Sequence, residues 1–126
     1  YMDALEGIPG VHLARFDSGE KNNYQYIVIE VNEEAAGLSR DLLVRLLHAE
    51  NIRARRYFYP GCHQMEPYRS YSPNAGLLLP ETEKLTQKVL QLPTGTAVIE
   101  ADVRKICDFI RFAVEHSSQI LEKIGN

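Results

Sequence analysis

The segment Tyr24–Val31 divides at a spacing of two residues into two sets of side chains, which is the clearest regular pattern of apolar and polar positions in the chain. Ile27, Ile29 and Val31 fall on one face of this segment, and Val28 falls on the other face together with two tyrosines. Successive side chains of a β-strand point to opposite faces of its sheet. Apolar residues on both faces therefore predict a central strand.

A shorter alternation begins at Val11 and ends near Phe16. The segment 17–23 that follows is polar and rich in turn-forming residues. This order predicts that the first two strands pair as an antiparallel hairpin. Two more strands are expected, over Ile52–Tyr59 and Val89–Leu92.

Three segments repeat their apolar residues at helical spacing, namely 39–50, 80–88 and 100–123. In the first of these, Ser39 is expected to cap the first turn. Leu42, Leu43, Leu46 and Leu47 form the narrow apolar stripe of a helix that packs on a sheet. The expected apolar face of the last helix consists of Val103, Ile106, Cys107, Ile110, Ala113, Val114, Leu121 and Ile124.

The chain has 126 residues, of which 44% are hydrophobic and 25% are charged. These values suit one globular domain, so we predict a single domain over 1–126 with an α/β fold of the α+β type. Its sheet is expected to be mainly antiparallel and packed by helices. A net charge of −3 and the absence of a long apolar run lead us to expect no nucleic acid and no membrane as partners. Two cysteines are too few for a disulfide framework and favour the cytoplasm.

The segment 52–71 concentrates tyrosines and arginines around a break at Pro60-Gly61. Aromatic rings beside cations can form a wall for a planar or phosphorylated ligand. An arginine-fringed edge strand followed by a turn explains the same composition, so both interpretations stay open. A cis Tyr59–Pro60 peptide bond is also expected, because an aromatic residue precedes the proline at a sharp exit from a strand.

Other kinds of chemistry find little support. Cys62, His63, His48 and His12 come from separate elements and lack the spacing of metal ligands. Cys62 and His63 are adjacent, and adjacent residues seldom face each other as a nucleophile and its base must. We therefore predict no metal site and no catalytic residue in this chain.

Three stretches in order carry a resemblance: NNYQYIVIEV, then LSRDLLVRLLHAENIRARRYFYPGCHQMEPYRS, then LPETEKLTQKVLQLPTG before a final amphipathic helix. From about Gly10 to Ile120 the chain resembles the C-terminal part of the DegT/DnrJ/StrS sugar aminotransferases. These enzymes use pyridoxal phosphate (PLP) on nucleotide-linked keto-sugars. The resemblance implies the small C-terminal domain of a fold type I enzyme.

The resemblance also implies that the PLP-binding domain is absent from this chain, which is then inactive alone. Lys21, Lys84, Lys88, Lys105 and Lys123 all fall in expected turns or on expected helix surfaces, without the small neighbours of a cofactor lysine. No cofactor-binding residue is therefore predicted here. The intact enzyme is expected to be a homodimer that takes a nucleotide sugar and an amino donor, by resemblance glutamate.

By the same resemblance, the substrate-binding candidates are Tyr57, Tyr59, His63 and Tyr68. Arg55 and Arg56 are candidates for screening a diphosphate, or are solvated charges on an edge strand. Phe112 falls among polar residues of the last helix. We expect it to be exposed, on a surface that meets the PLP-binding domain or a second subunit.

A second function class stays open. A freestanding α/β domain that binds a small molecule or regulates another protein uses the same hairpin, helix and strand units. Such a module has no partner domain with a cofactor lysine, and this feature separates the two hypotheses.

Overall fold

The fold is built on an antiparallel sheet whose strands come from both halves of the chain. The computed structural model describes residues 1–17 and 19–125, and within them the strand order is β1-β2-β4-β3. The strands are β1 (Val11–Leu13), β2 (Ile27–Val31), β3 (Arg55–Arg56) and β4 (Val89–Leu92). The predicted fold class, an α/β fold with an antiparallel sheet, is confirmed.

The predicted hairpin and central strand are also confirmed. Val11 of β1 lies opposite Val31 of β2, and Ile29 of β2 lies opposite Leu90 of β4. Strand β2 is therefore hydrogen-bonded on both of its edges. Ser18, which belongs to the expected turn of the hairpin, lies outside the described residues.

The three predicted helical segments all form helices. Ser39 accepts a 3.2 Å hydrogen bond from the Leu42 amide and so caps α3, as predicted. Pro80 occupies the first turn of α6, where its missing N–H costs nothing. The described helices are α1 (Met2–Leu5), α2 (Glu33–Ala36), α3 (Arg40–Ala49), η1 (Cys62–Gln64), α4 (Tyr68–Tyr71), α5 (Ala75–Leu78), α6 (Pro80–Lys88), α7 (Glu100–Glu115) and α8 (Ser117–Ile124).

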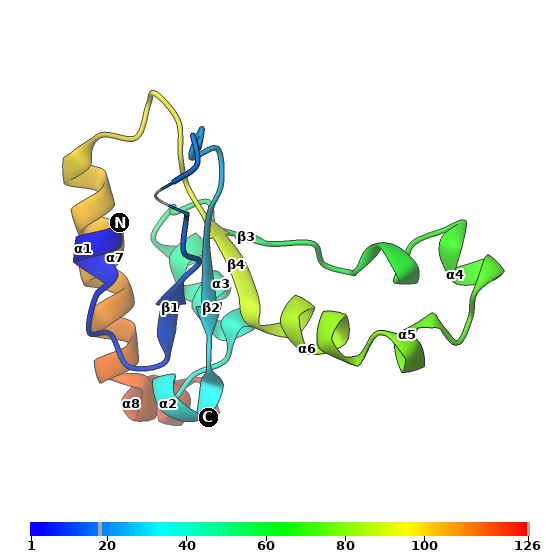
Figure 1. Cartoon of the computed structure of the whole chain (residues 1–126). Helices are drawn as coiled ribbons and strands as arrows, with labels where there is room; N and C mark the ends of the chain where they lie inside the picture. Colours follow the sequence, from blue (N-terminus) through cyan, green and yellow to red (C-terminus); the bar gives the residue numbers. More distant parts are fainter. Residues whose placement is uncertain (18, 126) are drawn as a thin grey trace.

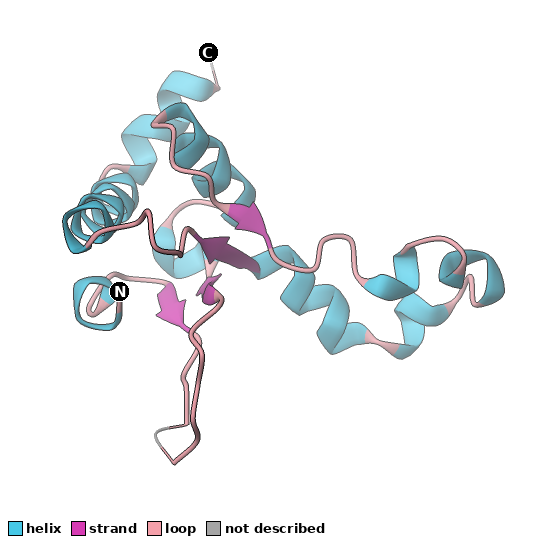
Figure 2. Ribbon diagram, turned by 90° about the horizontal axis from the view of Figure 1, so that it is seen from above, coloured by secondary structure: helices cyan, strands magenta, loops and turns pink. Residues whose placement is uncertain are grey.

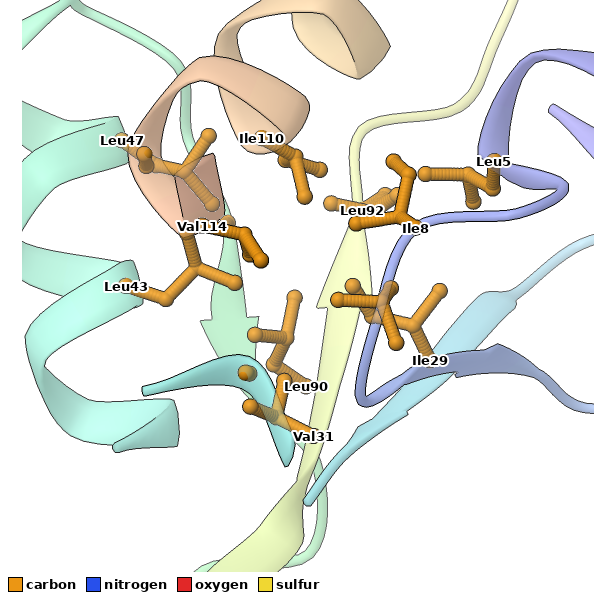
Figure 3. Close-up of a cluster of buried hydrophobic side chains, with 14 of the residues drawn as sticks. Leu5, Ile8, Ile29, Val31, Leu43, Leu47, Leu90, Leu92, Ile110 and Val114 are labelled. Atoms are coloured by element: carbon orange, nitrogen blue, oxygen red, sulfur yellow. The ribbon is translucent and has the colours of Figure 1, made fainter. Parts of the chain in front are cut away.

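The hydrophobic core lies between one face of the sheet and the helices α1, α3 and α7 (Figures 1 and 3). Ile29, Leu43, Leu90, Leu92 and Ile110 are all fully buried in it. The burial pattern of β2 alternates with period two, so Val28 and Glu30 point to the opposite face. The core therefore covers one face of the sheet, and the other face is available for a different contact.

The predicted strand Ile52–Tyr59 is wrong in length, because only Arg55–Arg56 pairs with β4. At its start, the Ile52 amide donates to the Leu47 carbonyl oxygen at 2.8 Å and extends the end of α3 instead. At its end, Phe58 has a φ of +50°, which stops an extended strand. The strand is confined to the residues between these two constraints.

The predicted helix 100–123 is two helices, because the chain bends at His116 between α7 and α8. The Nδ1 atom of His116 lies 2.9 Å from the Phe112 carbonyl oxygen, and its ring stacks on the Phe112 ring. Helix α8 then lies beside α2 (Figure 1). Leu121 and Ile124 are consequently exposed, against the expectation that they belong to the buried face.

Residues 57–88 form an arm that leaves the sheet after β3 and returns to it at β4 (Figures 1 and 2). The arm contains η1, α4, α5 and α6 in place of the expected loop, and it extends away from α3 and α7. The Tyr59–Pro60 bond at its start is cis, as predicted, and Glu66–Pro67 is cis as well.

Candidate ligand-binding groove

A groove of about 1050 Å³ lies between the arm and the sheet face that the core does not use. The sheet supplies the floor through His12, Val28 and Val89, and the arm supplies the walls. Most of the lining side chains are apolar or aromatic, which is typical of small-molecule sites. The arm residues that line it are Tyr57, Phe58, Gly61, Cys62, His63, Tyr68, Tyr71, Ser72, Ala75, Leu79, Glu81, Thr82, Leu85 and Thr86.

Three of the four residues proposed from the sequence line this groove. Tyr57, His63 and Tyr68 are separated by up to eleven residues, yet the arm brings them to one cavity. Tyr57 is half-buried, and its ring centroid lies 4.1 Å from Phe58 and 5.7 Å from Tyr26. Tyr57 and Phe58 thus form an aromatic wall of the groove, and Tyr26 packs on Tyr57 without lining the groove itself.

Tyr59 lies outside the groove and lines a smaller pocket of about 350 Å³. Its ring packs under two guanidinium groups, with Arg40 at 5.3 Å and Arg56 at 4.9 Å from the ring centroid. Both arginines pair with Asp41, at 2.7 and 3.0 Å. Tyr59 is thus part of a cluster that attaches the base of the arm to α3.

His63 is held by Glu83 of α6. Its Nε2 atom hydrogen-bonds to the Glu83 carboxylate, and the Gln64 amide donates to the same carboxylate oxygen at 2.5 Å. These two hydrogen bonds, that of His63 first, lower the pKa of Glu83 below its usual value. Gly61 makes room for the ring, since a Cβ atom there would lie 2.6 Å from Cε1 of His63. The imidazole therefore has a defined position in the groove wall.

No lysine or arginine lines the groove, whereas Glu30 and Glu81 do. Arg55 and Arg56 are exposed on the edge strand β3. This location fits their interpretation as solvated charges on an edge strand. Four of the five lysines are exposed, and the fifth, Lys88, forms a 3.8 Å ion pair with Glu30. The residues of this chain therefore do not fit as holders of PLP, which needs a lysine in its pocket.

Within residues 1–17 and 19–125 no group of three or more potential metal ligands lies together. Of the four residues considered from the sequence, His12, Cys62 and His63 line the groove without forming such a group, and His48 points to the Ala54 carbonyl oxygen. In the same part of the chain, no helix is both long and apolar enough to cross a membrane.

The fold is that of a known class of transferase. The sequence model of the DegT/DnrJ/EryC1/StrS aminotransferase family matches residues 1–111, and the chain belongs to this family. It is 34% identical over 106 residues to the dTDP-4-amino-4,6-dideoxy-D-glucose transaminase of Escherichia coli. The match covers 84% of this chain and 28% of that enzyme.

Solved structures agree with the sequence matches. DesI, crystallised in the presence of its TDP-sugar product, superposes with a TM-score of 0.85 at 38% identity, over 98% of this chain and 31% of DesI. A family member from Brucella abortus superposes with a TM-score of 0.69 at 29% identity, over 87% of this chain and 27% of its own. The chain thus spans less than a third of the length of these relatives.

Sequence reasoning missed several groove residues. Phe58 and Tyr71 were within the aromatic stretch but had no pattern to separate them from its other rings. Glu83 carries no sequence signal for its contact with His63, because twenty residues separate the two. The floor residues on β1 and β2 could be found only by recognising that the outward face of the hairpin has no helix to cover it.

Proposed function

We propose that this chain is the C-terminal, substrate-facing domain of a PLP-dependent aminotransferase that acts on a nucleotide-linked sugar. The observation that carries the proposal is the similarity to DesI, which extends over 98% of this chain at 38% identity. The Escherichia coli relative suggests the substrate class more narrowly, a dTDP-linked 4-amino-4,6-dideoxyhexose or the corresponding keto-sugar. Glutamate is the proposed amino donor.

The groove is proposed to take an uncharged part of the substrate. Its walls are aromatic and aliphatic, and no lysine or arginine lines it. Lys88 and Lys84 are already paired with the lining residues Glu30 and Glu81, so the groove offers a diphosphate no unpaired cation. Flat rings and the apolar faces of sugars pack well on tyrosine side chains. We therefore assign the base or the sugar ring to the groove, and the diphosphate to cations outside it.

The candidate residues divide accordingly. Tyr57 and Tyr68 are proposed to pack on the ligand, and His63 to hydrogen-bond to it. Tyr59 is proposed to contact the ligand only through the smaller pocket, because its ring is engaged by Arg40 and Arg56. PLP is proposed to bind to a part of the protein outside these 126 residues, in a cytoplasmic homodimer.

The proposal is tested on the protein produced from the whole reading frame that contains this chain. Transamination of dTDP-4-amino-4,6-dideoxy-D-glucose with 2-oxoglutarate is measured for wild type, Tyr57→Ala, Tyr68→Ala and Tyr24→Ala. Loss of an aromatic contact of about 1.4 kcal/mol corresponds to a tenfold weaker affinity. We expect KM for the nucleotide sugar to rise about tenfold in the first two variants.

Tyr24→Ala is the matched control, since Tyr24 is exposed and packs on Phe16 away from the groove. It should keep the wild-type KM. Absence of transamination with dTDP-, UDP- and GDP-linked amino sugars would overturn the proposed reaction. An unchanged KM in both groove variants would overturn the assignment of the groove.

A further inference from the structure

His63 contributes a hydrogen-bonding atom, Nδ1, to the wall of the groove, beside the hydroxyl groups of Tyr57, Tyr68 and Tyr71. His63 has 10% of its side chain exposed, and Nε2 is committed to Glu83. Nδ1 has no hydrogen-bond partner among the described residues. In the described part of the chain, every buried side-chain nitrogen or oxygen has a hydrogen-bond partner. Because Nδ1 has none, it is accessible to solvent. His63 lines the groove, and its Nδ1–Cε1 edge lies beside Gly61, which lines the groove as well.

The chemistry of Glu83 decides what Nδ1 can do. An ionised carboxylate accepts hydrogen bonds and donates none. The Gln64 amide and the imidazole both lower the pKa of Glu83, so this group is ionised at neutral pH. The proton between His63 and Glu83 therefore resides on Nε2. In a neutral imidazole, Nδ1 is then left as an acceptor.

We propose that Glu83 is a positioning residue that selects the tautomer of His63 with its proton on Nε2, so that Nδ1 accepts a hydrogen bond from the ligand. The ligand group must then be a donor, such as a hydroxyl or an amine. Glu30 and Glu81, which also line the groove, are acceptors of the same kind. The assignment deepens the proposed function, since the hydroxyl and amino groups of an aminosugar are donors of this class.

The tautomer is measured directly on the ¹⁵N-labelled 126-residue chain by long-range ¹H–¹⁵N correlation at pH 8, without any ligand. The signals of the four histidines are assigned with the variant His63→Gln. We expect the wild-type His63 ring to show a protonated Nε2 and an unprotonated Nδ1. A proton on Nδ1, either alone or together with Nε2, would overturn the proposal.

Two variants test whether Glu83 sets the tautomer of His63 or only lies close to it. In Glu83→Gln the side-chain amide can donate as well as accept, so the strong preference for the Nε2 proton should be lost. In Gly61→Ala the new methyl group would lie 2.6 Å from Cε1 and 2.9 Å from Nδ1, so the ring must shift and its contact with Glu83 is disturbed, with the same expected result. Glu122→Gln, an exposed glutamate of α8, controls for the substitution and should leave the spectrum of His63 unchanged. If Glu83→Gln does not fold, the tautomers of wild type and of Gly61→Ala test the proposal. An unchanged His63 tautomer in a variant that folds contradicts it.

A second measurement concerns the ligand. In the protein from the whole reading frame, Glu83→Gln should raise KM for dTDP-4-amino-4,6-dideoxy-D-glucose about tenfold, the worth of one ordinary hydrogen bond. Since no bond-making step is assigned to His63, kcat should change little. An unchanged KM would overturn the ligand contact alone, and failure of all transamination would overturn the proposed function while leaving the tautomer result intact.

Discussion

Arg40 donates a 2.6 Å hydrogen bond from Nη1 to the carbonyl oxygen of Val89, and so ties the first turn of α3 to the start of β4. Only 2% of Arg40 is exposed. Its guanidinium also lies over the ring of Tyr59, at the point where the arm leaves the sheet. This one buried side chain therefore joins both ends of the arm to the body of the domain.

Replacing Arg40 by methionine should destabilise the chain by about 1–3 kcal/mol, because the Val89 carbonyl oxygen loses its 2.6 Å hydrogen bond and keeps only the longer one, 3.5 Å, from the Tyr57 amide. Urea unfolding measures the change. Arg45→Met on the same helix is the matched control, since Arg45 is exposed, and it should lie within about 0.5 kcal/mol of wild type. Equal stabilities of the two variants would show that Arg40 does not hold the arm.

Two leucines of equal size should differ sharply in their contribution to stability. Leu43 is fully buried against the sheet, so Leu43→Ala should cost about 2–5 kcal/mol of unfolding free energy. Leu78 on the arm is 81% exposed, so Leu78→Ala should cost less than about 0.5 kcal/mol. A large loss for Leu78 would mean that the arm packs on its own chain more closely than its exposure indicates.

The two free cysteines should react very differently with a thiol reagent. Cys62 is exposed, whereas Cys107 is buried and its burial raises the pKa of the thiol. Because the thiolate is the reactive form, the folded chain should be labelled at Cys62, and at both cysteines in denaturant. Cys62→Ser should then give no rapid labelling of the native chain. Rapid native labelling of Cys107 would contradict the position of α7 in the core.

The Glu83 contact should make stability depend on acid. The folded-state pKa of Glu83 is lowered by His63 and Gln64, so the unfolded chain binds this proton first as the pH falls. The stabilisation is complete above the ordinary carboxyl pKa and is lost on acidification through the lower, folded value. The gap in unfolding free energy between wild type and Glu83→Gln should thus shrink from pH 7 to pH 3. A gap that stays constant over this range is the contrary result.

The elements that sequence patterns predicted are those that bury a regular face. Strand β2 and helix α3 alternate or repeat their apolar residues because one side of each meets the core, and Ser39 carries a local capping signal. The bend at His116 has no such signal, since the apolar repeat continues through it to Ile124. It follows from contacts of α8 that are distant in sequence, as between Ser117 and Gly37.

The arm could be recognised as unusual but its internal structure could not be predicted. Its short helices bury none of their residues, so no periodic pattern marks them. The tyrosines and His63 were found from composition and resemblance. Their separation into a groove that holds Tyr57 and a smaller pocket that holds Tyr59 depends on the turn at Phe58, whose positive φ the sequence does not signal.

Several large apolar side chains are exposed on the final long helix and on the arm. Phe112 is 51% exposed, as predicted, and Leu77, Leu78 and Tyr71 on the arm are more exposed still. Burying each such side chain contributes roughly 1.5–3 kcal/mol. Adding the remainder of the reading frame should therefore protect these side chains from solvent. Surface labelling of Tyr71 in the long and short proteins tests this, and equal labelling would contradict it.

The most direct test asks which lysine binds the cofactor. The 126-residue chain and the protein from the whole reading frame are each incubated with PLP, scanned for visible absorbance, reduced with borohydride and mapped by peptide mass. We predict a bound cofactor in the longer protein alone, attached to a lysine outside residues 1–126. Labelling of Lys21, Lys84, Lys88, Lys105 or Lys123 as the specific site, or a longer protein that binds no PLP, would contradict the assignment of this chain to the substrate-facing domain of an aminotransferase.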